Sequence, residues 1–272
     1  MESDKTTNKR HSDEVIEIVK NMTLFDDMLM SKVFEKNIKA TELVLRIILG
    51  RDIHVMTVEA QHKLQAHPVE ARSITLDIYA IDEDGKEIDI EVQSDPRGSS
   101  IKRARFHSSM MDSHMLQAGQ GFDELNDSYV IFIYKHDKFG EGLPIYSVDR
   151  CIRETGKFIG DGSHIIYVNG AYKGNDDIGK LIADFHQSDT SKMNYEELRE
   201  STEHFKTLQK GDDAMSEAVE NYANKVATEA VGNDRREIAV NLKKQGLPLE
   251  QIAQAFNCQI DLVKSWLTPS AT

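Results

Sequence analysis

The chain has 272 residues, of which 39% are hydrophobic and 29% charged, an ordinary composition for a globular protein. No apolar run approaches the roughly 18 residues that a membrane-spanning helix needs, so no transmembrane helix is expected. The formal net charge of −13 disfavours broad nonspecific coating of nucleic acid. It leaves room for a local basic groove or for an acidic site that needs a cation.

The N-terminal segment 1–21 is polar and has no hydrophobic signal core, so we expect a loosely structured lead and no secretory signal. Cys151 and Cys258 are far apart in the sequence. They argue against a disulfide framework or a cysteine-rich zinc site and fit a reducing compartment. We therefore expect a cytoplasmic protein.

Apolar spacing over residues 26–49 predicts one or two helices that end at Gly50. Residues 53–60 read as a strand. The segment 61–72 contains Pro68 and reads as a connection.

The segment 73–93, SITLDIYAIDEDGKEIDIEVQ, predicts a β-hairpin, because apolar and polar residues alternate on both sides of a turn. A two-residue loop would set Asp77 opposite Val92, a polar residue facing an apolar one. A three-residue loop, Glu83-Asp84-Gly85 with the glycine in the left-handed conformation, sets Asp77 opposite Glu91 instead. We predict the second register.

This register brings the carboxylates of Asp77 and Glu91 onto one face, with Cβ atoms about 5 Å apart. Two such groups repel unless something binds between them. A hard divalent cation with oxygen ligands, Mg²⁺ or Mn²⁺, is the natural candidate. The alternative is a solvated acidic face, since Glu87 and Asp89 continue the same row.

A basic stretch follows the hairpin. Residues 95–98 predict a turn, and Ser99 is the expected N-cap of a helix that runs to about Ala118. Between Pro96 and Met111 there is no acidic residue. The cations in that stretch are Arg97, Lys102, Arg103 and Arg105. Carboxylates that hold a metal, beside cations that hold phosphate oxygens, are what phosphodiester hydrolysis needs. The alternative is a basic helix that only offsets the acidic hairpin.

The downstream pattern predicts a buried strand at 129–134 and a loop at 139–144. It then predicts two short strands, at 145–148 and 164–168, and a helix at 177–185. The expected fold class is therefore α/β, with a mixed sheet and helices on its faces. We expect a lead at 1–21, a main domain at 22–190, a helical connector at 191–232 and a C-terminal unit at 233–272.

The C-terminal unit predicts three helices, at 235–245, 249–256 and 260–267, in an arrangement that resembles a helix-turn-helix. Residues 234–267 carry five basic and four acidic side chains, a poor balance for binding phosphate. We favour packing or homo-oligomerisation through these helices, with DNA contact as the alternative.

Four segments, in order, resemble the PD-(D/E)xK nuclease superfamily. More closely, they resemble the bacterial recombination-promoting nuclease group that is also described as PD-(D/E)XK nuclease family transposases. The segments are DMLMSKVF at 27–34, LDIYAIDEDGKEIDIEVQ at 76–93, KRARFHSSMMD at 102–112 and SYVIFIYKHDKFGEGLPIY at 128–146. The resemblance covers roughly residues 24–185. It implies a restriction-endonuclease-like αβββαβ core, followed by an all-helical C-terminal region.

The resemblance implies that Asp77 and Glu91 are the principal ligands of Mg²⁺, which Mn²⁺ can replace, with the Val92 carbonyl as a third ligand. Asp27 would add an outer carboxylate, unless it only caps its helix. Gln93 stands where the superfamily usually has a lysine, and it can orient water but carries no charge.

Arg103 or Arg105 can supply the missing charge, and at helical spacing only one of them faces the site. We favour Arg105. Arg97 and Lys102 would join both arginines in contacting DNA. Histidine pairs such as His107 with His114 lack a matching third zinc ligand, and we interpret them as surface or structural residues.

The sequence thus predicts a Mg²⁺-dependent DNA endonuclease with Asp77, Glu91, Gln93 and one of the two arginines as its catalytic groups. An alternative from a different class is an inactive nuclease scaffold that acts through oligomerisation or partner binding. A third interpretation is a DNA-binding regulator that works through the C-terminal helices.

Overall fold

The computed structural model describes residues 16–66, 71–95, 100–208 and 234–267, together with 221, 228 and 232. The chain divides into two compact units, one spanning 19–210 and one that includes 234–267. The domain boundaries expected from the sequence stay predictions. Across the described part of the chain, no helix combines the length and apolarity needed to cross a membrane.

The larger unit is built on a six-stranded mixed sheet with the order β1-β2-β3-β4-β8-β5. Its strands are β1 (Val55–Leu64), β2 (Ile74–Asp82), β3 (Glu87–Gln93), β4 (Ser128–Tyr134), β5 (Ile145–Val148) and β8 (Ser163–Asn169). The central strands β3, β4 and β8 run parallel, and both edges are antiparallel. Both faces of the central β4 are covered, and every residue of it except Tyr129 is buried, as predicted for a central strand.

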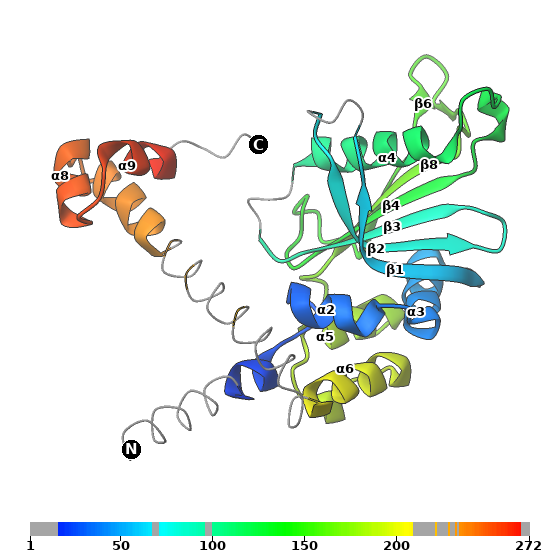
Figure 1. The fold of residues 1–272 in the computed structure, drawn as a ribbon, viewed down its shortest axis with the longest axis horizontal. Coiled ribbons are helices and arrows are strands. Elements are labelled where there is room, and N and C mark those ends of the chain that lie inside the picture. The colour runs from blue at the N-terminus through cyan, green and yellow to red at the C-terminus, as the bar shows by residue number, and fades with distance from the viewer. Residues whose placement is uncertain are drawn as a thin grey trace. The chain divides into compact units, whose positions relative to one another are not determined.

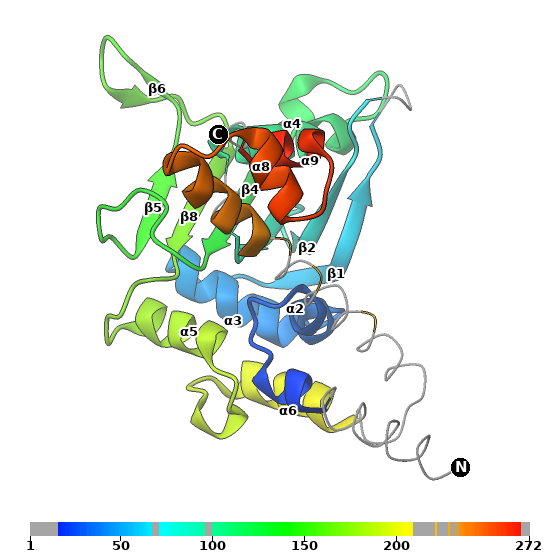
Figure 2. The same ribbon diagram turned by 90° about the vertical axis from the view of Figure 1, so that its left-hand side faces the viewer.

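Helices cover both faces of this sheet (Figures 1 and 2). α4 (Ile101–Met115) packs on one face against β4 and β8, while α2 (Asp27–Phe34) and α3 (Ile38–Leu49) pack on the other. α5 (Asp177–His186) packs on α3, and α6 (Glu196–Leu208) packs on α2. The order α2–α3, β1, β2, β3, α4, β4 confirms the expected αβββαβ core.

The hairpin register is confirmed. Ile78 pairs with Ile90 and Ile81 pairs with Glu87, which places Asp77 next to Glu91 along the same ladder. The loop is closed by the Asp82 N–H, which donates to the Lys86 carbonyl at 3.1 Å. Gly85 has φ +79°, the left-handed conformation that this loop requires.

The alternative of a solvated acidic face on β3 is wrong. Its residues from Ile88 to Val92 are all buried, and Asp89 and Glu91 are 0% and 1% exposed. The reason is that α4 covers the face on which the acidic side chains lie. Alternation predicts which residues share a face, but it does not predict which element covers that face.

Other element boundaries shift by a few residues. β1 continues to Leu64 because Lys63 and Leu64 pair with the start of β2, so the connection begins later than expected. α4 is capped by Ser100, whose hydroxyl accepts the Lys102 N–H at 3.2 Å, and Ser99 lies outside the described residues. The helix ends at Met115 because Leu116 is extended.

A short hairpin, β6 (Cys151–Ile152) with β7 (Lys157–Phe158), was not predicted from the sequence. Each of its strands has two residues, and all four are exposed. Neither strand is long enough for period-2 alternation to show.

The C-terminal unit contains three helices, as predicted: residues 234–244, α8 (Leu249–Ala255) and α9 (Ile260–Leu267). Its small core consists of Ala239, Ile252, Ala253 and Val263. Trp266 packs edge-to-face on Phe256, with ring centroids 5.4 Å apart. The helical connector expected at 191–232 is described in part: it contains α6, and residues 209–220 lie outside the described residues.

Candidate active site

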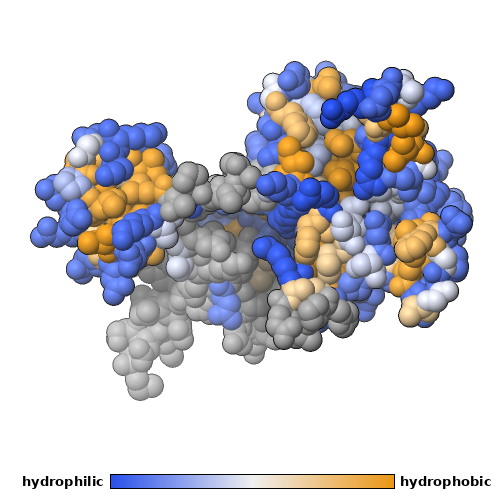
Figure 3. Space-filling view, turned by 90° about the horizontal axis from the view of Figure 1, so that it is seen from above, coloured by the Kyte–Doolittle hydropathy of each residue, from blue (hydrophilic) through white to orange (hydrophobic). Residues whose placement is uncertain are grey.

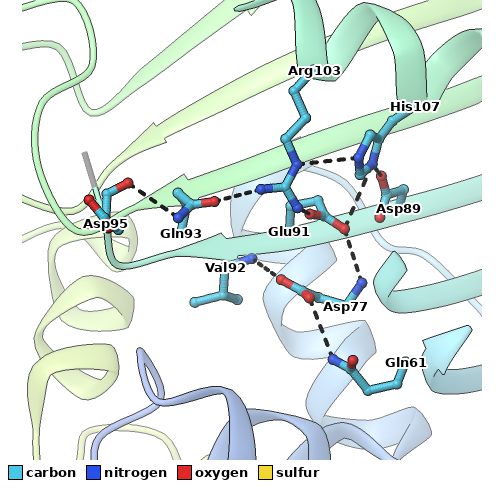
Figure 4. A network of polar contacts seen from close by, with 9 residues as sticks. All are labelled: Gln61, Asp77, Asp89, Glu91, Val92, Gln93, Asp95, Arg103 and His107. Carbon is cyan, nitrogen blue, oxygen red and sulfur yellow. Dashed lines mark hydrogen bonds and ion pairs between the residues drawn. The ribbon is translucent and has the colours of Figure 1, made fainter. Parts of the chain in front are cut away.

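The site begins where the backbone ladder between β2 and β3 ends. The last described backbone pair is Ile78 with Ile90, and beyond it side chains replace the ladder. The Asp77 N–H donates to Glu91 Oε1 at 3.0 Å, and the Val92 N–H donates to Asp77 Oδ2 at 3.0 Å. The two carboxylates therefore lie at a fork between the strands, each held by the backbone of the other strand (Figure 4).

Arg103 reaches down from α4 to this fork. Its Nη2 pairs with Glu91 Oε2, and its Nη1 donates to Gln93 Oε1 at 2.7 Å. The Gln93 amide also donates to the Asp95 carbonyl at 3.2 Å. The guanidinium thus supplies a positive charge beside the residue that stands in place of the usual lysine (Figure 4).

Behind Arg103 lies a buried pair that extends the network away from solvent. His107, one helical turn after Arg103, places Nδ1 2.8 Å from Asp89 Oδ2. Its Nε2 lies 3.4 Å from Arg103 Nε, which donates to it. Asp89 and His107 are 0% and 2% exposed. Asp89 Oδ1 has no hydrogen-bond donor within the described part of the chain.

Burial shifts the ionisation of all these acids in the same direction. It raises the pKa of Glu91 well above its ordinary range, and the charges of Asp89 and Asp77 add to the shift. Burial likewise raises the pKa of Asp89 well above its ordinary range and raises that of Asp77. Burial lowers the pKa of His107. Burial therefore disfavours the charged form of each of these groups.

The charge balance fits a divalent cation. When Asp77, Asp89 and Glu91 are all ionised, they carry three negative charges against the single positive charge of Arg103. Two negative charges then remain in a largely buried site, and a divalent cation would neutralise them. Carboxylate oxygens are also the ligand type that Mg²⁺ and Mn²⁺ prefer.

The outer side of the fork is open. Asp77 is half-buried, and the exposed Gln61 directs its amide to Asp77 Oδ1 at 3.5 Å. Asp27, exposed at the start of α2, lies near enough for its charge to raise the pKa of Asp77. The N-cap position of α2 belongs to Asp26, so the alternative of Asp27 as an N-cap is wrong.

A second set of possible ligands lies deeper. The ligand atoms of Asp89, Glu91 and His107 lie within 4.8 Å of one another. As arranged, however, His107 Nε2 accepts from Arg103, so the neutral ring carries its proton on Nδ1. A protonated Nδ1 cannot bind a metal, so the fork at Asp77 and Glu91 fits the cation better.

Of the residues proposed from the sequence, the structure brings together Asp77, Glu91, Gln93 and Arg103. It corrects the preference for Arg105, which is exposed on α4, whereas Arg103 contacts Glu91 and Gln93. Lys102 is exposed on the same helix, and Arg97 lies outside the described residues.

Asp89 and His107 were not identified as site residues from the sequence. The signals available were the acidic row of the hairpin and the four-residue spacing of Arg103 and His107. These signals predict a contact between His107 and Asp89 only when α4 is known to lie over β3.

The PD-(D/E)XK nuclease family transposase family matches residues 25–169, just over half of the chain. The matched segment includes the residues of the fork, together with Arg103 and His107. No curated protein and no solved structure gave a significant match. By its sequence and by the fold and site described above, this chain belongs to the PD-(D/E)XK nuclease family transposase family.

Proposed function

We propose that this protein is a cytoplasmic DNA endonuclease that hydrolyses phosphodiester bonds with Mg²⁺, which Mn²⁺ can replace. The family supports a nuclease role, and PD-(D/E)XK nucleases use divalent metals. The observation that carries the proposal is the fork, where Asp77 and Glu91 meet between diverging strands and Arg103 lies against Glu91.

Asp77 and Glu91 would hold the cation, with the Val92 carbonyl as a further ligand and Asp27 as an outer carboxylate. When bound, the cation supplies activation of water and stabilisation of negative charge on the phosphate. Buried acids with raised pKa values bind a cation only by losing their protons, so the site exchanges protons for metal.

The remaining residues act on the substrate. Arg103 would hold a phosphate oxygen, because its guanidinium is planar and permanently charged. Gln93 holds Arg103 through its Oε1 and would orient water with its remaining hydrogen-bonding capacity. Lys102, Arg105 and Arg97 would contact the DNA backbone outside the fork.

The test is cleavage of supercoiled plasmid with Mg²⁺ or Mn²⁺, comparing wild type with Glu91→Gln and Asp77→Asn and using EDTA as a chelation control. These substitutions keep the shape of each side chain and remove its charge. We expect nicking or linearisation by wild type, and its loss in both variants and in EDTA.

Glu83→Gln is the matched control, because Glu83 is an exposed carboxylate in the loop of the same hairpin. It should cleave like wild type. No cleavage by wild type, with no binding of Mn²⁺ in calorimetry, would instead favour an inactive scaffold that binds a partner.

We also propose that the C-terminal unit mediates homo-oligomerisation. Ile238 and Leu262 are 49% and 47% exposed on its helices. Figure 3 shows hydrophobic surface on this unit, the left-hand group of coloured atoms. Exposed apolar side chains on a small helical unit are typical of a protein–protein contact.

A further inference from the structure

Asp89 and His107 are buried polar groups to which the proposed reaction gives no part. Burying a carboxylate and an imidazole costs free energy unless they are hydrogen-bonded. Their mutual bond of 2.8 Å offsets that cost. Two apolar residues would fill the same space with less penalty. The contacts that the pair makes with its neighbours indicate its role.

The direction of the hydrogen bonds is fixed by Arg103. An arginine Nε always donates, so the Nε2 atom of His107, at 3.4 Å, must accept. The neutral ring then carries its proton on Nδ1, which donates to Asp89 Oδ2. Every group in the chain from Arg103 through His107 to Asp89 has a defined role as donor or acceptor.

We propose that Asp89 and His107 form a positioning pair that fixes the guanidinium of Arg103 against Glu91 and Gln93. Three nitrogen atoms of the planar group are then held, by Glu91, Gln93 and His107. The guanidinium carbon also lies 5.6 Å from the ring centre of Phe132, which limits its position from one side. A planar group held at three nitrogen atoms has little freedom to rotate.

The catalytic consequence rests on the proposed function. With the ring of His107 in place, the guanidinium of Arg103 has a fixed orientation toward an incoming phosphate. Without it, the side chain loses its third contact and samples other rotamers. A misplaced contact group costs about tenfold to hundredfold in rate, and metal binding at the fork is unaffected.

The first test compares His107→Phe with His107→Gln in plasmid cleavage with Mn²⁺. Phenylalanine removes both ring nitrogens, whereas a glutamine amide can donate to Asp89 and accept from Arg103. We expect His107→Phe to lower kcat about tenfold or more at unchanged Mn²⁺ affinity, and His107→Gln to restore most of the loss. Equal losses in the two variants would overturn the proposal.

A double-mutant cycle separates positioning from a general structural effect. In an Arg103→Ala background, His107→Phe should cause no further loss, because the residue that it positions is gone. Additive losses would overturn the proposal. If His107→Phe fails to fold because Asp89 is left unpaired, the Asp89→Leu/His107→Phe variant removes both polar groups, and the same losses of kcat are expected with and without Arg103 when Mn²⁺ is saturating.

The second test needs no activity, so it remains informative if wild type does not cleave DNA. Nitrogen-15 NMR of histidine-labelled protein identifies the ring tautomer, with His107→Gln used to assign the signal. We expect a neutral ring protonated on Nδ1 at pH 7, as the contacts with Arg103 and Asp89 both require. A ring protonated on Nε2, or an imidazolium, in wild type would overturn the proposal.

Discussion

Glu91 is the residue on which the whole site converges. It accepts the Asp77 N–H, pairs with Arg103 and lies beside Asp89, all while almost fully buried. Its ionisation therefore depends on its neighbours more than on solvent. This coupling makes two predictions at the scale of single residues.

The first concerns pH. Because burial raises the pKa of Glu91, and protons must leave before a cation binds, Mn²⁺ affinity should rise with pH. The gain should reach up to about tenfold per pH unit for each proton displaced. Calorimetry in buffers of different ionisation enthalpy counts those protons. Asp89→Asn removes a neighbouring charge, so the rise should shift to lower pH; a pH-independent affinity would contradict this account.

The second concerns the two arginines. Arg103→Ala should lower cleavage about a hundredfold, the usual cost of removing one group that stabilises charge in the transition state. Arg105→Ala is the matched control, since Arg105 is exposed on the same helix. It should change only DNA affinity, and more so at low salt. Steady-state kinetics at two salt concentrations distinguishes these effects; equal kcat losses in both variants would refute the assignment of Arg103.

At the scale of elements, β1 contains a residue with left-handed backbone conformation beside the fork. Gln61 has φ +56° inside the strand, and it lies opposite Asp77. The other described non-glycine residues with positive φ, Lys36 and Asn257, both lie in turns that follow helices. Beyond this point the apolar residues Leu64 and Leu76 pack in the same cluster as Ala104 of α4. The strained backbone of Gln61 therefore lies directly beside Asp77 of the fork.

Gln61→Gly should raise stability by about 1 kcal/mol, because glycine adopts a left-handed φ without strain. The measurement is the unfolding free energy from urea titration. Lys63→Gly is the control, an exposed residue of the same strand that is not among the positive-φ residues. It should destabilise by about 0.5–1 kcal/mol. If Gln61→Gly destabilises as much as the control, the left-handed conformation is not strained.

At the scale of the whole molecule, the nuclease core and the C-terminal helices are separate compact units. All the residues of the fork belong to the larger unit. The helices at 234–267 have their own core and carry five basic and four acidic side chains, a balance that suits contact with protein better than with DNA.

Deleting residues 234–272 should leave cleavage largely intact and lower the oligomeric state. Sedimentation velocity of the full chain and the deletion variant measures the second effect. Leu262→Glu in the full chain is the point variant, since Leu262 is 47% exposed. It should dissociate the assembly without unfolding α9. Loss of DNA binding in the deletion variant would instead support the interpretation as a DNA-binding regulator.

The sequence by itself determined the element order of the core as far as β4, the register of the hairpin and the pairing of Asp77 with Glu91. These are local properties, set by alternation and by turn chemistry at Gly85. The motifs in order also indicated the family. Alternation could place the acidic residues of β3 on one face of the strand, but whether solvent or a helix covers that face is not a local property.

Only the tertiary structure decided that α4 lies over that face, and with it the choice of Arg103 over Arg105. Helical spacing states that the two cannot both face the site, and the rotation of the helix is set by packing of Ala104 and Met111 into the core. The same packing buries His107 on Asp89. Side chains far apart in sequence meet because the helix buries its apolar face on the sheet. The polar side chains at that interface are buried with it, so they must form hydrogen bonds with one another.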